Sequence, residues 1–132
     1  MGGWSRRLPD LRVTRRGTGM HELSIMSHLL GMVEEEAARV HATRVVGVNL
    51  VVGDRTHVVD DSLLFCFELL AADTVAQGAQ LHITRTATQF HCERDGDYTP
   101  AGDDFRCPAC QEPGALTERG NELLVQSIEV ET

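Results

Sequence analysis

Three of the four cysteines fall in one short segment and have the spacing of metal ligands. Cys107 and Cys110 form a Cys-x-x-Cys pair, and fourteen residues separate Cys92 from Cys107. Two thiolates on such a tight knuckle can reach one ion at about 2.3 Å, and a second knuckle would complete a zinc tetrahedron. The spacing therefore favours a zinc site in a cysteine-rich insert, which we assign to residues 90–118 and call the insert.

The sequence leaves the fourth zinc ligand open. A four-cysteine site would require a cysteine at position 95, where the chain has Asp95. Carboxylate is a permitted but less common zinc ligand. His91 is chemically the better ligand, but it is adjacent to Cys92, and neighbouring side chains on an extended segment point to opposite sides. Asp95, His91, water and an exogenous thiol all remain as alternatives.

The Cys107–Cys110 pair also resembles the motif of dithiol oxidoreductases. That chemistry needs a helix after the pair, because the dipole of the helix lowers the pKa of the first thiol. Pro113 and Gly114 follow almost at once and would break such a helix. Oxidoreductase activity is therefore disfavoured. Cys66 stands among apolar residues of a predicted helix, and we expect it to be buried there as a small hydrophobic side chain.

A second metal-binding pattern lies at Met20, His21 and Glu22. If translation begins at Met20, four nitrogens can surround an ion in one plane: the Met20 amine, the His21 amide and imidazole, and the Glu22 amide. Such a plane suits Ni(II) or Cu(II) and suits tetrahedral zinc badly. An internal Met20 offers an amide in place of the amine, so residues 1–19 would weaken the site. From composition alone, His21 also fits an ordinary surface histidine.

The periodicity of apolar residues indicates the elements that position these ligands. Steps of three and four residues predict a helix over 22–41 and a second helix that begins at Asp60–Ser62, whose polar side chains could cap it. Alternation predicts strands over 44–54 and 122–131, and the content of Thr, Ile and Leu predicts a strand over 80–89. In the first of these strands, the apolar face is expected to hold Val46, Val48, Leu50 and Val52.

The order of these elements predicts an α/β (α+β) fold. A small three-stranded sheet would carry two helices, and a zinc-ribbon-like insert would interrupt the chain before the last strand. Residues 20–89 and 119–132 then form the nickel-binding α/β domain around the insert. Residues 1–19 form a leader that we expect to be disordered or to reflect a misassigned start.

The charge of the chain is uneven and limits its partners. Residues 1–19 carry a net charge of +4 and the remainder carries −12. An acidic body repels polyphosphate, so we expect no binding to nucleic acid. No apolar run approaches the roughly 20 residues that cross a membrane, and the leader lacks the apolar region of a secretory signal. We therefore expect a cytoplasmic protein, in which spaced cysteines more often bind metal than form disulfides.

Several segments together resemble the HypA/HybF family of hydrogenase nickel-incorporation proteins. These segments are MHELSI, VNLVVGD, DSLLFCFELL, GAQLHI, CPAC and GNELLVQSIEVE, which lie between Met20 and Glu131. The resemblance implies a metallochaperone without catalytic turnover, in which His21, with Glu22 beside it, binds Ni(II) as transient cargo. It also implies structural Zn(II) held by two Cys-x-x-Cys knuckles, which are matched here by Cys92, Cys107 and Cys110. Asp95 stands where the family has cysteine.

The resemblance further implies partners for the chain. Nickel would pass to the large subunit of NiFe hydrogenase, with the help of a hydrogenase accessory GTPase. A homodimer is an open alternative for the assembly of the chain itself. A different function class also stays open, namely a zinc-ribbon interaction or regulatory module of the same family that has lost nickel delivery. The leader and Asp95 favour that module.

Overall fold

The structure is a computed structural model, and it describes residues 3–12, 22–102 and 104–132. Met20 and His21 of the proposed nickel site lie outside the described residues. The elements follow one another as β1 (Gly3–Arg12), α1 (Glu22–Arg39), β2 (Arg44–Gly53), the short 3-10 helix η1 (Asp54–Thr56), α2 (Asp60–Ala71), β3 (Gln80–Thr86), β4 (Phe90–Cys92), β5 (Gly96–Tyr98), β6 (Ala115–Leu116) and β7 (Leu123–Glu131). The two helices and the mixed sheet confirm the α/β class.

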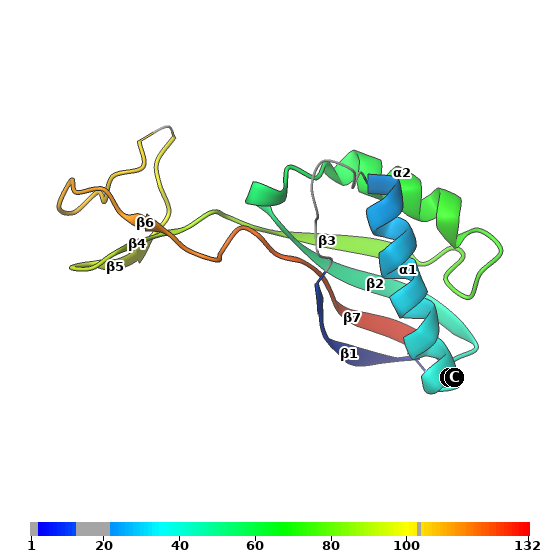
Figure 1. Cartoon of the computed structure of the whole chain (residues 1–132). Coiled ribbons are helices and arrows are strands. Elements are labelled where there is room, and N and C mark those ends of the chain that lie inside the picture. The colour runs from blue at the N-terminus through cyan, green and yellow to red at the C-terminus, as the bar shows by residue number, and fades with distance from the viewer. Residues whose placement is uncertain (1–2, 13–21, 103) are drawn as a thin grey trace.

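The main sheet has four strands in the order β1-β7-β2-β3. β7 pairs antiparallel with both of its neighbours, whereas β2 and β3 are parallel. A parallel pair needs a crossover connection, and α2 provides it. Figure 1 shows α1 and α2 beside one another over this sheet.

The core lies between the helices and the sheet. α1 buries one face at helical spacing, through Ile25, Met26, Leu29, Leu30, Val33 and Ala37. The sheet contributes fully buried residues from its two central strands, among them Leu50, Val52, Val125 and Ile128. Each such side chain contributes about 1.5–3 kcal/mol when it leaves water. The predicted first helix is confirmed, and it ends at Arg39 rather than at 41.

The apolar face of β2 differs from the prediction at one end of the strand. Val48, Leu50 and Val52 are buried as expected, but Val46 is only half-buried and Val45 is fully buried in its place. The register of β2 against β7 shifts between Val45 and Gly47. A slip of one residue turns side chains to the other face of a sheet, which explains the exchange.

The leader contributes a strand that the sequence analysis does not anticipate. Gly3–Arg12 form β1, which pairs with β7 and gives the sheet four strands where three are predicted. The pairing is irregular between Arg7 and Leu11, around Pro9. Proline cannot donate a ladder hydrogen bond, and it weakens the strand pattern of this segment in the sequence. Residues 13–19 lie outside the described residues.

The insert forms a second, smaller sheet at one end of the molecule. Its strands follow the order β5-β4-β6, and Figure 1 shows them projecting beyond the ends of β3 and β7. β3 leads into this sheet and β7 leads out of it. Within the described part of the chain, no helix has the length and apolarity that would carry it across a membrane.

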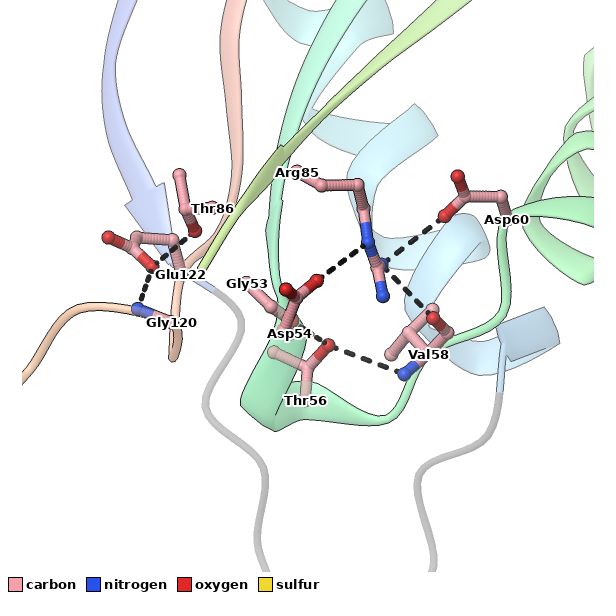
Figure 2. A network of polar contacts seen from close by, with 9 residues as sticks. All are labelled: Gly53, Asp54, Thr56, Val58, Asp60, Arg85, Thr86, Gly120 and Glu122. Atoms are coloured by element: carbon pink, nitrogen blue, oxygen red, sulfur yellow. Dashed lines mark hydrogen bonds and ion pairs between the residues drawn. The ribbon is translucent and has the colours of Figure 1, made fainter. Parts of the chain in front are cut away.

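An arginine network anchors the start of α2 (Figure 2). The Arg85 guanidinium on β3 lies 3.2 Å from Asp54 Oδ1 and 3.2 Å from Asp60 Oδ1, and it donates a hydrogen bond of 3.1 Å to the Val58 carbonyl. Asp60 was expected to cap α2, but the helix has no side-chain cap, and Val59 precedes its first turn. The Asp60 carboxylate is thus compensated by Arg85 on the neighbouring strand.

Replacing Arg85 should weaken the fold measurably. Because Arg85, Asp54 and Asp60 are all partly exposed, we expect Arg85→Met to lower the free energy of unfolding by about 1 kcal/mol, near the top of the range for exposed pairs. Urea unfolding at low and high salt measures this loss, which should shrink as salt screens the charges. Arg39→Met is the matched control, because its exposed pair with Glu36 is local to α1 and should cost at most about 0.5 kcal/mol. Equal losses in the two variants would contradict the network.

Candidate functional site

Four side chains of the insert converge on one point. The sulfurs of Cys92, Cys107 and Cys110 and one carboxylate oxygen of Asp95 all lie within 4.8 Å of one another. Cys92 Sγ lies 3.6 Å from Cys110 Sγ and 3.6 Å from Asp95 Oδ2, and Cys107 Sγ lies 3.4 Å from the same oxygen. We call these four residues the insert centre.

Two tight turns bring the four side chains together. In the first, Cys92 ends β4 and pairs with Gly96 of β5, so that Asp95 lies in the connecting turn. Gly96 has a φ of 83°, which favours glycine. In the second, the Gln111 amide donates a hydrogen bond of 2.8 Å to the Cys107 carbonyl, which closes the turn over Cys110. Each turn thus holds two possible metal ligands that are separated by two residues, as in a zinc knuckle.

The geometry of the insert centre fits a tetrahedral zinc ion. With bonds of about 2.3 Å to sulfur and about 2.1 Å to oxygen, a tetrahedron has edges of about 3.8 Å between sulfurs and about 3.6 Å between sulfur and oxygen. The separations of 3.6 Å and 3.4–3.6 Å around Cys92 and Asp95 lie close to these edges. Three of the four donors are soft thiolates, which bind zinc in preference to magnesium or calcium.

The thiols of the insert centre differ in their readiness to lose a proton. Hydrogen bonds from the backbone amides of Asp95 and Arg94 lower the pKa of Cys92. A backbone hydrogen bond from Glu112 lowers the pKa of Cys110, but burial and the neighbouring thiols outweigh it and raise that pKa to about 11. Without a metal, Cys110 is therefore protonated at neutral pH.

His91 is not part of the insert centre. Its ring points to the other side of β4, as expected for the neighbour of Cys92, and its Nδ1 lies 2.7 Å from Asp97 Oδ1 on β5. Of the alternatives that the sequence left open among protein side chains, the structure thus places Asp95 with the three cysteines. Cys66 is 8% exposed and belongs to the main core, which confirms its prediction as a buried small residue.

The sequence analysis did not identify the packing that supports the insert. The ring of Phe90 stacks on Tyr98 and on Phe105, with centroids 5.9 Å and 5.5 Å apart. The Tyr98 hydroxyl also donates a hydrogen bond to the Phe105 carbonyl. The available signal was the presence of three aromatic residues in a segment otherwise rich in Cys, Asp, Gly and Pro.

The other candidate site lies at the start of α1. Glu22 is the first residue of the helix and is half-buried. It lines a surface hollow of about 410 Å³ together with residues from the start of α2, namely Asp61, Ser62, Phe65 and Cys66. Glu22 thus begins a helix that packs against α2.

Comparison with known proteins gives a family for this arrangement. The family model described as hydrogenase/urease nickel incorporation, metallochaperone, HypA matches residues 20–130. The hydrogenase maturation factor HypA of Dehalococcoides mccartyi strain CBDB1 is 42% identical over 113 residues, which cover 85% of this chain and 95% of that protein. The corresponding factor of Caldanaerobacter subterraneus subsp. tengcongensis is 38% identical over 114 residues, which cover 85% and 100%.

Solved structures agree with this assignment. A solution structure of a HypA protein matches with a TM-score of 0.65 and 26% identity, over 86% of this chain and 98% of that chain. The solution structure of the Ni metallochaperone HypA from Helicobacter pylori matches with a TM-score of 0.59 and 24% identity, over 86% and 99%, and so shares the fold. The chain therefore belongs to the HypA family of nickel-incorporation metallochaperones of hydrogenase maturation.

Proposed function

We propose that this protein binds Ni(II) and delivers it, without catalytic turnover, to the large subunit of NiFe hydrogenase during maturation. The observation that carries the proposal is the family match, which covers residues 20–130 and so includes Met20, His21 and the insert. A hydrogenase accessory GTPase is the proposed helper, and the cytoplasm is the proposed compartment. Incubation of the nickel-loaded chain with metal-free large subunit tests the proposal, because transferred nickel should then co-purify with the large subunit.

The proposed nickel ligands are the nitrogens at residues 20–22. In a chain that begins at Met20, the terminal amine has an ordinary pKa of about 7.7–8.0 and can give up its proton to a metal near neutrality. The His21 imidazole and the amides of His21 and Glu22 complete a plane of four nitrogens, which suits Ni(II). A chelate at the beginning of a chain is open to solvent, and cargo transfer requires such access.

The second proposed metal is Zn(II) in the insert centre. Cys92, Cys107, Cys110 and Asp95 would hold it, since their separations match a zinc tetrahedron and three of the donors are thiolates. Bound zinc would tie the two turns of the insert to each other. We expect one zinc per full-length chain, measured by elemental analysis after gel filtration.

Zinc binding should release protons. Because the pKa of Cys110 is about 11 in the metal-free protein, this thiol carries a proton below that pH and must lose it to become a ligand. The apparent affinity should therefore rise with pH across the neutral range, by about tenfold per pH unit for each proton released. Calorimetry at one pH in buffers of different ionisation enthalpy counts these protons, and at least one per zinc is expected. A binding heat independent of the buffer would contradict ligation by Cys110.

A further inference from the structure

The four ligand residues of the insert centre differ in their exposure to solvent. Cys92 and Cys107 are 5% and 1% exposed, and Cys110 is half-buried. Asp95, in contrast, is exposed. Asp95 is therefore the most exposed of the four ligand residues.

A hollow of about 530 Å³ adjoins the centre at its sulfur ligands. It is lined by two of the ligands, Cys92 and Cys110, and by residues of both turns, including Glu93, Arg94 and Glu112. A small chelator or thiol has room in this hollow beside two sulfurs. Access to the ion therefore does not require the insert to unfold.

The exposed ligand is also the weakest of the four. Zinc prefers soft thiolates, and a carboxylate is a harder donor. Three thiolates and one carboxylate carry the same total charge as four thiolates, so Asp95 in place of a cysteine changes the bond and leaves the net charge of the loaded centre unaltered. A difference in zinc retention between the native chain and Asp95→Cys would therefore reflect the strength of the bond between residue 95 and the ion.

The insert has packing that does not depend on the ligands. The stack of Phe90 on Tyr98 and Phe105 lies outside the centre. Next to it, the Thr117 hydroxyl and amide both donate hydrogen bonds to the Gln89 carbonyl, at 2.7 Å and 3.0 Å. These contacts hold the ends of the insert together whether or not a metal is bound.

We propose that the insert centre is an exchangeable zinc site in which Asp95 acts as the gate. The proposal rests on the zinc ligation stated under the proposed function. In the exchange step, the bond between the Asp95 oxygen and the ion breaks, and a donor atom of an incoming chelator or thiol forms a bond in its place. No electrons are transferred. Zinc occupancy of the insert then follows the availability of zinc, whereas a closed four-cysteine site retains its metal as part of the fold.

Zinc release from the full-length chain tests the gate directly. Each protein is loaded with one zinc and then mixed with excess EDTA or a zinc-sensitive dye, and the release rate is recorded. We expect Asp95→Cys to slow zinc release by about tenfold or more. Substitutions of groups that only support a metal ligand already change metal affinity by about 10–100-fold, and a change of the ligand itself should do at least as much. Glu93→Gln is the matched control, since Glu93 is an exposed acid of the same hollow outside the centre, and its release rate should equal that of the native chain.

The outcomes separate the gate from the zinc site itself. Equal release rates for the native chain and Asp95→Cys, with one zinc bound to each, would overturn the gate. A native chain that binds no zinc would instead overturn the proposed zinc site. Asp95→Ser keeps three thiolates and covers the case in which Asp95→Cys does not fold. Because serine removes the carboxylate bond that must break in the exchange step, release should be at least as fast as from the native chain, and slower release would contradict the gate.

Discussion

His21→Ala, in a chain that begins at Met20, is expected to lower the affinity for Ni(II) by about 100-fold or more. The substitution removes the imidazole, one of the four proposed nitrogens. Changes to groups that only support a metal ligand already cost about 10–100-fold in affinity, so loss of a direct ligand should cost at least the upper end of that range. Equilibrium dialysis against nickel at fixed pH measures the change.

His28→Ala is the matched control for this prediction. His28 is exposed on α1 and stands seven residues after His21, which corresponds to about 10 Å along a helix, too far to share the ion. Its removal should leave nickel affinity unchanged. If both substitutions had the same effect, or if His21→Ala had none, the assignment of His21 would fail.

The largest expected loss of stability comes from Gly53→Ala. Gly53 ends β2 and is buried, and a Cβ added there would collide with the Gly120 carbonyl and lie 2.6 Å from the Asn121 amide nitrogen. Its φ of −80° and ψ of 147° suit any residue, so the need for glycine here is steric and not conformational.

The collision would separate β2 from the segment that returns from the insert. The Gly53 amide donates to the Glu122 carbonyl at 2.7 Å, and the Arg55 amide donates to the Gly120 carbonyl at 2.7 Å. Overpacking costs about 1–3 kcal/mol and each lost hydrogen bond about 1 kcal/mol, so we expect a loss of about 3 kcal/mol or more. Urea unfolding of the zinc-loaded chain measures it.

Gly31→Ala is the control for the glycine substitution. Gly31 lies inside α1, and a Cβ added there would meet no atom within 4 Å. Alanine is the better helix former, so this variant should gain about 0.5–1 kcal/mol. A loss of similar size in both variants would mean that the close approach at Gly53 does not hold the two segments together.

The features that could be predicted from the sequence are those set by neighbouring residues. The burial of α1 follows from apolar steps of three and four residues, and the convergence of Cys107 and Cys110 follows from a turn of four residues. Asp95 was one candidate because it stands three residues after Cys92, and the structure brings its carboxylate to the three sulfurs. In each case the signal is a short spacing in the sequence, either the period of a helix or the two ends of a turn, although the two turns themselves meet across 12 to 18 residues.

The features that could not be predicted depend on distant partners. Asp60 has the pattern of a helix cap, but Arg85 on β3 pairs with it instead. Val45 replaces Val46 in the core because of a register shift against β7, which only the pairing of the two strands reveals. The residues of β1 show only a weak strand pattern around Pro9. The strand forms by pairing with β7, a distant segment of the chain.

The most direct test of nickel delivery is X-ray absorption spectroscopy at the nickel K-edge. The sample is the nickel-loaded chain that begins at Met20, and the full 132-residue chain is measured beside it. The proposed site predicts four nitrogen donors in a plane, one of them an imidazole, in the shorter chain, and weaker or altered coordination in the longer one. An octahedral, oxygen-rich environment without imidazole in the shorter chain would contradict nickel carriage by His21.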